Sequence, residues 1–143
     1  LNSRLDTIQA AILLEKLKIF PTELKSRDKL AEAYMEYLYH PSCTGPMLES
    51  NKTSAWAQFT VKTPFRDDFR AGLASMNIPT AIYYPKPLHL QAGYKHFPVV
   101  STGVINSQNL SDTVFSLPMH PYINDVAEHV KNIASVFNNI KIT

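Results

Sequence analysis

The sequence contains little cysteine and little glycine, and each shortage excludes a class of protein. Its single cysteine, Cys43, cannot form an internal disulfide and fits a reducing compartment, so we expect a cytoplasmic protein. The four glycines are scattered along the chain and form no Gly-rich loop of the kind that binds phosphate. No apolar stretch reaches the roughly 18 residues that span a membrane, so no membrane segment is predicted.

Charged residues are also few, and the sequence lacks the signals of nucleic-acid binding, of a metal site and of a serine nucleophile. Charged residues make up 18% of the chain and the net charge is +2, without a stripe of Lys and Arg, so nucleic-acid binding is not expected. The five histidines are isolated in sequence and lack metal-ligand spacing, and no serine nucleophile motif is present. With 45% hydrophobic residues, the chain is typical of one globular domain over residues 1–143.

The beginning of the sequence indicates a piece of a longer protein. There is no initiating Met and no secretory leader, and the first residues read as the start of a helix. Ser3 and Asp6 resemble a helix-capping pair. We therefore expect a fragment that begins with helices over residues 1–39.

These helices carry an unusually wide apolar surface. The apolar residues over 5–20 cover so broad an arc that we expect burial between two layers or between subunits. Pro21 interrupts the pattern. Residues 22–39 then either begin a second helix, capped by Thr22, or continue the first helix through a kink.

Strand and helix patterns alternate over residues 54–143. Strands are predicted at 54–62, 80–83 and 112–117, and helices at 66–76, 90–96, 104–110 and 124–140. This order predicts an α/β domain of the two-layer α+β kind, with about three strands in the sheet and helices packed on one face.

The segment around Tyr83 and Tyr84 collects polar aromatic tips beside two prolines, Pro85 and Pro87. The tyrosines either pack in a core or interface or face a ligand, and neighbours in an extended segment point to opposite sides. His89 is either structural or a general acid or base. The prolines predict a rigid shelf, which lowers the ordering cost of binding.

Among three further polar residues, Asn2 and Arg4 each have two interpretations and His120 has one. Asn2 and Arg4 are either surface groups or an amide and a guanidinium offered to a phosphate or carboxylate near a helix start. For His120, which lies in a bend between two prolines, we expect only a hydrogen bond to a nearby carbonyl.

Several motifs, taken together and in order, resemble the DegT/StrS family of fold type I, pyridoxal-phosphate-dependent sugar aminotransferases. They are N-x-R-L-D-x-I-Q-A-A at 2–11, Arg27 and Tyr34, I-P-T at 78–80, Y-P at 84–85, P-L-H at 87–89 and S-L-P-M-H-P at 116–121. The resemblance covers the whole chain.

The resemblance implies a large N-terminal domain that binds pyridoxal phosphate (PLP) and a small C-terminal domain that corresponds to this chain. Residues 1–39 would be the linking helices and 54–143 the sheet with its helices. The Schiff-base lysine would lie outside the chain, so Lys16, Lys18 and Lys86 are not assigned that role and no catalytic residue is expected here.

The family's site lies at a homodimer interface, which assigns roles by position. Asn2 would reach the cofactor phosphate of the neighbouring subunit. Arg4 would hold the anionic portion of the substrate, and Tyr83, Tyr84 and His89 would bind the nucleotide sugar.

The implied reaction transfers an amino group, with glutamate as the expected donor, to a nucleotide-linked keto sugar of cell-surface polysaccharide synthesis. The 3-keto-glucuronate type is the nearest resemblance. Two alternatives stay open: a sugar dehydratase of the same family, and a non-catalytic domain that binds a sugar nucleotide or a protein. The chain alone is expected to be inactive.

Overall fold

The computed structural model describes residues 4–141, and its longest element is the helix α1 (Thr7–Tyr37). Asp6 is the N-cap, and its carboxylate accepts a hydrogen bond of 2.8 Å from the backbone N–H of Gln9. Its predicted capping partner, Ser3, lies outside the described residues. Pro21 lies inside the helix without ending it, so continuation is confirmed and a second start at Thr22 is wrong.

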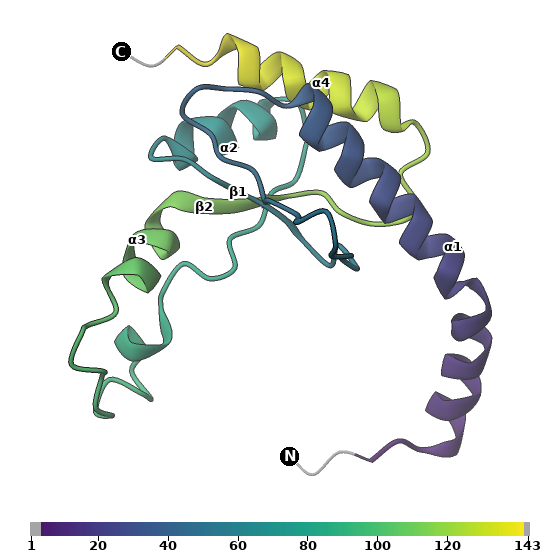
Figure 1. Ribbon diagram of the computed structural model, residues 1–143, viewed down its shortest axis with the longest axis horizontal. Coiled ribbons are helices and arrows are strands. Elements are labelled where there is room, and N and C mark those ends of the chain that lie inside the picture. The colour runs from purple at the N-terminus through teal and green to yellow at the C-terminus, as the bar shows by residue number, and fades with distance from the viewer. Residues whose placement is uncertain (1–3, 142–143) are drawn as a thin grey trace.

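The two halves of α1 have different surroundings. Leu30, Ala31 and Tyr34, in the second half, are buried in the core. The first half extends away from the rest of the chain (Figure 1). Its exposed apolar side chains are Leu5, Ile8, Ile12, Leu13, Leu14, Leu17, Ile19 and Phe20. The expected burial between two layers is therefore wrong for this chain, and burial against another lobe or subunit stays a prediction.

The described residues form one sheet of two antiparallel strands, β1 (Phe59–Lys62) and β2 (Val114–Leu117). The predicted third strand at 80–83 is reduced to one isolated bridge, Ala81↔Ser116. Pro85 and Pro87 lack the N–H that a longer strand would need, so pairing cannot continue in that direction. The mixed helix and strand fold is confirmed, with two strands where three were expected.

The sheet has one apolar face and one polar face. Phe59 pairs with Leu117 and Val61 with Phe115, and all four side chains are buried. On the opposite face, Thr60 pairs with Ser116, and their hydroxyl oxygens lie 2.8 Å apart. This period-two alternation leaves one face of the sheet free of the core.

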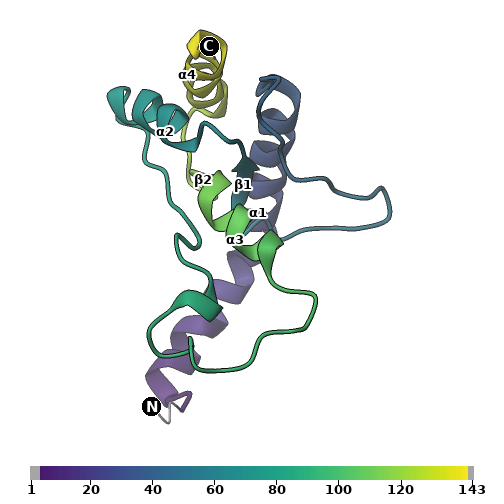
Figure 2. The same ribbon diagram turned by 90° about the vertical axis from the view of Figure 1, so that its left-hand side faces the viewer.

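Helices cover the apolar face. They are α2 (Arg66–Ser75), α4 (Val126–Asn139) and the second half of α1, which lie on the same side of the strands (Figures 1 and 2). In the core, the rings of Phe69 and Phe137 meet edge to face, with centroids 4.9 Å apart. Among residues 4–141, no helix is both long and apolar enough to cross a membrane.

The end of α2 turns the chain toward the outer edge of β2, where Ala81 pairs with Ser116. Asn77 has a φ of 57°, the left-handed conformation that Gly and Asn tolerate best. Ile78 N–H donates to Leu73 O, at 3.0 Å, and Asn77 N–H to Ala74 O, at 2.9 Å. These are the two bonds of a Schellman motif, completed by the buried side chains of Leu73 and Ile78.

Two short helices follow beside β2. The predicted helix at 90–96 is a 3₁₀ turn, η1 (Leu88–Leu90), followed by turns, and the predicted helix at 104–110 is α3 (Ile105–Thr113). Both lie below the sheet, opposite the first half of α1, and the chain therefore forms an arch (Figure 1).

Gly72 lies on α2 where this helix meets α4. A Cβ atom at this position would lie 2.7 Å from Cγ1 of Val136, which is buried and stiff because it is β-branched. We predict that Gly72→Ala lowers the free energy of unfolding by about 1–3 kcal/mol, although alanine favours helices more than glycine does. Urea unfolding measures this change.

Two further variants isolate the contact. Gly93→Ala is the matched control, since a Cβ there has no neighbour within 4 Å. In a Val136→Ala background, where the obstructing methyl is gone, Gly72→Ala should have little additional effect. The same loss in both backgrounds would show that the contact is not the cause.

Candidate functional site

Three neighbouring surface hollows run from β2 to the segments around η1 and α3. We name them by one residue each. The Met119 hollow, of about 360 Å³, is defined by Gln58, Thr80, Tyr83, Ser116, Met119 and His120. The Tyr84 hollow, of about 500 Å³, is defined by Tyr83, Tyr84, Lys86, Pro87, Ser111 and Val114. The Phe97 hollow, of about 510 Å³, is defined by Pro87, Leu88, His89, Tyr94, Phe97 and Ser107.

The hollows are joined by shared walls. Tyr83 lines both the Met119 and Tyr84 hollows, and Pro87 lines both the Tyr84 and Phe97 hollows. A ligand longer than one hollow can therefore contact several of them. Pro87, whose φ is −63°, holds the wall between two of them in a fixed backbone conformation.

Tyr83 and Tyr84 do not point to opposite sides as expected. Both line the Tyr84 hollow, with ring centroids 5.8 Å apart and planes at 75°. The prediction assumed an extended segment, whereas the chain bends at Tyr83. Tyr83 is 48% exposed and Tyr84 70%, so packing in the core of this chain is wrong for both.

His89 lies on the 3₁₀ turn η1 and is half-buried in the wall of the Phe97 hollow. The amide of Gln91 donates to Lys86 O, at 3.3 Å, which closes the turn that carries it. The structure thus brings Tyr83, Tyr84 and His89 onto one row of hollows. Their roles toward a ligand stay predictions.

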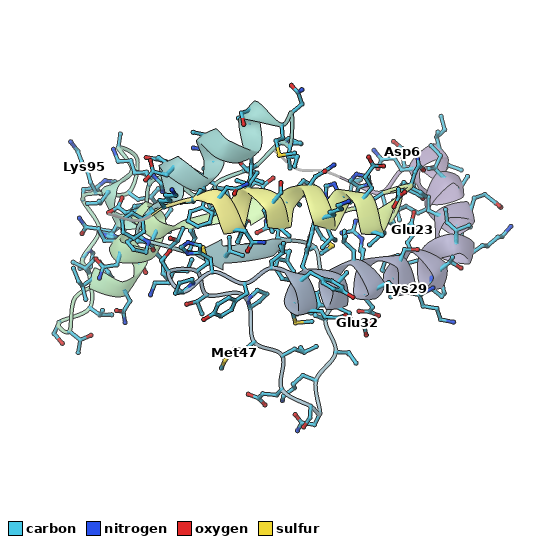
Figure 3. All side chains as sticks on the ribbon, turned by 90° about the horizontal axis from the view of Figure 1, so that it is seen from above. Asp6, Glu23, Lys29, Glu32, Met47 and Lys95 are labelled. Atoms are coloured by element: carbon cyan, nitrogen blue, oxygen red, sulfur yellow. The ribbon has the colours of Figure 1, made fainter. Side chains whose placement is uncertain are left out.

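Arg4 is not part of this row. It is exposed and precedes α1 directly. The start of α1, marked by Asp6, and the segment after η1, marked by Lys95, lie at opposite ends of the molecule (Figure 3). Asn2 lies outside the described residues. Within one chain, the structure therefore separates Arg4 from the tyrosines, and the role predicted for Arg4 stays a prediction.

Several polar residues in the hollows were missed by sequence reasoning. They are Gln58, Thr80, Lys86 and Ser107. His120 was expected to bond a carbonyl, but its Nδ1 instead accepts a hydrogen bond of 3.2 Å from Tyr122 N–H. No Asp or Glu of the described chain lines any of the three hollows. The row is therefore neutral to basic.

Polar side chains on one face of α1 form hydrogen bonds to the backbone of the segment that lines the Met119 hollow. Arg27 Nη1 donates to Met119 O, at 3.2 Å, and to Trp56 O, at 2.9 Å. Four residues earlier, the carboxylate of Glu23 accepts from the Tyr122 hydroxyl. The spacing places both on one side of the helix, and we call Glu23, Arg27 and Tyr34 the polar stripe.

Tyr34 completes this stripe through a second network. Its hydroxyl oxygen lies 2.7 Å from Pro118 O and 2.7 Å from His129 Nε2. The carbonyl can only accept, so Tyr34 donates to it and His129 must donate its Nε2–H to Tyr34. Burial raises the pKa of Tyr34 far above its ordinary value, which keeps the hydroxyl neutral.

The described residues contain no group of three or more His, Cys, Asp or Glu side chains that could hold a metal ion. Cys43 is half-buried, and burial raises the pKa of its thiol. A raised pKa disfavours the thiolate that nucleophilic chemistry needs.

The sequence and the structure were compared with known proteins. Residues 1–138 match the DegT/DnrJ/EryC1/StrS aminotransferase family. The chain is 38% identical over 141 residues to the UDP-2-acetamido-2-deoxy-3-oxo-D-glucuronate aminotransferase of Pseudomonas aeruginosa, and the match covers 96% of the chain and 37% of that protein.

Two solved structures show the same fold. A DegT DnrJ EryC1 StrS aminotransferase from Brucella abortus has a TM-score of 0.88 and 44% identity, over 96% of this chain and 36% of that one. DesV of S. venezuelae, in complex with a ketimine intermediate, has a TM-score of 0.88 and 27% identity, over 98% and 38%. The chain thus spans little more than a third of each relative's length.

The Tyr34–His129 network predicts a pH dependence of stability. Burial lowers the pKa of His129, and the charge of His120 lowers it further. In the unfolded chain the pKa is about 6.5, so below that pH the unfolded state binds more protons. The free energy of unfolding should therefore rise with pH from the lowered pKa of His129 up to about 6.5.

His129→Gln tests this origin, because its amide can still donate to Tyr34 while it cannot titrate. Urea unfolding between pH 5 and 7.5 should show a smaller slope in this variant than in the wild type. His96→Gln, at an exposed position, is the matched control and should keep the wild-type slope. Equal slopes in all three proteins would contradict the assignment to His129.

Proposed function

The chain belongs to the DegT/DnrJ/EryC1/StrS aminotransferase family, and from this premise we propose that it is the C-terminal small domain of a PLP-dependent sugar aminotransferase. The family match over residues 1–138 is the observation that carries the proposal, and it confirms the resemblance seen in the sequence. Because the chain spans 37% of its P. aeruginosa relative, the activity is that of a longer protein.

We propose a nucleotide-linked keto sugar as substrate. The P. aeruginosa relative is named for a UDP-linked 3-oxo-glucuronate, and a transaminase from Aneurinibacillus thermoaerophilus, 34% identical over 137 residues, for a dTDP-linked amino sugar. The hollows support an anionic ligand, since they contain Lys86, His89 and His120 but no acid among the described residues. Tyr83 and Tyr84 present exposed rings that can pack on a base or sugar.

The described residues do not by themselves fit the cofactor. All ten lysines lie within residues 4–141 and all have exposed side chains, whereas a lysine that binds PLP covalently needs a pocket that tunes its pKa. PLP supplies the electron sink for amino-group transfer. We propose that a preceding domain binds it, and that Asn2 contacts its phosphate in the neighbouring subunit.

The arch supports a division of the site between two subunits. The start of α1, which Arg4 precedes, lies at one end of the arch, and the Phe97 hollow lies toward the other, so one copy of the chain does not bring Arg4 and that hollow together in this conformation. A homodimer would place Arg4 of one subunit against the substrate of the other. The exposed apolar side chains over 5–20 would then be covered, as large apolar patches on soluble proteins commonly are.

The proposed reaction is tested with the full-length protein, which we propose to be cytoplasmic. Incubation with PLP, glutamate and a UDP-linked 3-keto glucuronate should yield the 3-amino sugar, identified by mass spectrometry, with equal consumption of glutamate. A product that has lost a hydroxyl group and gained no nitrogen would instead indicate a dehydratase. No change in any nucleotide-linked keto sugar would contradict both.

Arg4 is tested by substitution in the full-length protein. Arg4→Ala should raise the KM for the sugar nucleotide about tenfold, because it removes charge-assisted hydrogen bonds to an anionic group. The cofactor absorbance should change little. Arg4→Lys keeps the charge but loses the planar fork and should give an intermediate KM.

Lys16→Ala is the matched control on the same helix, since Lys16 is an exposed cation that we assign no role in binding. Its KM should equal the wild-type value. A wild-type KM in Arg4→Ala would remove Arg4 from the substrate site, and a lost cofactor absorbance would move it to the cofactor.

A further inference from the structure

The Met119 hollow contains side-chain hydrogen-bond donors to which the proposed function assigns no role. Five side chains in its wall carry polar groups: Gln58, Thr80, Tyr83, Ser116 and His120. The Ser116 hydroxyl oxygen already lies 2.8 Å from that of Thr60. The existing partners of Thr80 and His120 decide what these two groups can still offer to a ligand.

His120 is left as a donor. Its Nδ1 accepts from Tyr122 N–H, at 3.2 Å, so in the neutral ring the proton lies on Nε2. The Tyr122 hydroxyl in turn donates to Glu23 on α1, which ties the turn to the polar stripe. These contacts orient the imidazole ring, and its Nε2–H can donate to a ligand.

Thr80 is also left as a donor. Arg70 Nε donates to its hydroxyl oxygen, at 3.2 Å. That oxygen has accepted a bond from a cation, so its hydrogen is available to a further group. Arg70, whose Nη1 also lies 3.8 Å from Asp67 Oδ1, orients the Thr80 hydroxyl from α2.

Four carbonyls around the hollow are already engaged. Pro118 O accepts from Tyr34 and Met119 O from Arg27. Ser116 O accepts from Ala81 N–H, at 3.2 Å, and Ala81 O from Ser116 N–H, at 2.7 Å. No acidic side chain within residues 4–141 lines this hollow. Among the groups described above, the Thr80 hydroxyl and the His120 Nε2–H remain as donors to a ligand.

We propose that the Met119 hollow is a subsite for a carboxylate, held by His120 Nε2–H and the Thr80 hydroxyl, with Gln58 at its rim. A carboxylate only accepts hydrogen bonds, so it matches these two donors. The volume of about 360 Å³ also admits the carbon skeleton attached to it, beside Pro79 and Met119. This proposal rests on the proposed function, which supplies two carboxylates: that of a uronate sugar and that of the amino donor.

The polar stripe gives the subsite its geometry. Arg27 and Tyr34 are positioning residues, since they bond the backbone of Met119 and Pro118 and would not touch the ligand. The bridge Ala81↔Ser116 holds Thr80 against the same wall. Both donors are thereby fixed before a ligand arrives, which reduces the entropy cost of binding.

The test measures binding to the full-length protein by calorimetry, independently of turnover. UDP-glucuronate and UDP-glucose differ only in a carboxylate or hydroxymethyl group at the sugar, and glutarate and glutaramide form the corresponding pair for the donor. His120→Ala should weaken one carboxylate probe about tenfold, a change of ~1.4 kcal/mol, and leave its neutral partner within twofold. The probe affected identifies the source of the carboxylate.

Conservative variants separate binding from structure. His120→Gln keeps an N–H near the position of Nε2 and should retain most of the affinity. Thr80→Ser should bind as the wild type does, whereas Thr80→Val, which has the same shape without the hydroxyl, should lose affinity for the same probe. His96→Ala, at an exposed position outside the three hollows, is the control.

Two results would overturn the subsite. The first is a wild-type protein that binds neither carboxylate probe better than its neutral partner. The second is an equal loss for both members of a pair in His120→Ala. Either result with an active aminotransferase contradicts the subsite alone, whereas an inactive wild-type protein that discriminates the probes contradicts the proposed function and leaves the subsite in place.

Discussion

The Met119 hollow depends on one interaction, the pair of hydrogen bonds from Arg27 to two backbone carbonyls that are far apart in sequence. One nitrogen of its guanidinium bonds Trp56 O and Met119 O, and so joins α1 to the segments that enter β1 and leave β2. Trp56 has a φ of 45°, a conformation that few side chains adopt. The second half of α1 thus fixes the positions of both segments. The buried ring of Tyr34 packs against Phe59, with centroids 4.9 Å apart, and adds apolar contacts to the hydrogen bonds of the polar stripe.

The elements that the sequence predicts well are those with a strong local pattern. The helix α4 follows from its period of apolar residues. The sequence predicts a third strand but not its reduction to a single bridge. How far the prolines shorten the pairing depends on the partner strand, which the sequence does not reveal. The continuity of α1 through Pro21 is likewise a tertiary result: the second half is anchored by packing, which outweighs local helix propensity.

The site is harder to predict than the fold because its residues meet only after folding. Thr80 and His120 are 40 positions apart, and they share a wall because Ala81 pairs with Ser116. In sequence, His120 between two prolines looks structural. Its donor role emerges only when the partner of each ring nitrogen is known. Residue type singles out Tyr83 and Tyr84, and both line a hollow, but their predicted orientation was wrong, because it depends on a bend that residue type does not specify.

A single continuous α1 has a mechanical consequence. Its 31 residues correspond to roughly 45 Å of helix, with exposed apolar side chains at one end and the polar stripe at the other. Any body that covers the apolar end is therefore placed at a defined distance and angle from the hollows, because the helix and the stripe leave little freedom between them. Correct orientation of reacting groups accounts for several kcal/mol of a reaction barrier. In this arrangement, the position of any body that covered the apolar end of α1 would depend on the same contacts that shape the Met119 hollow.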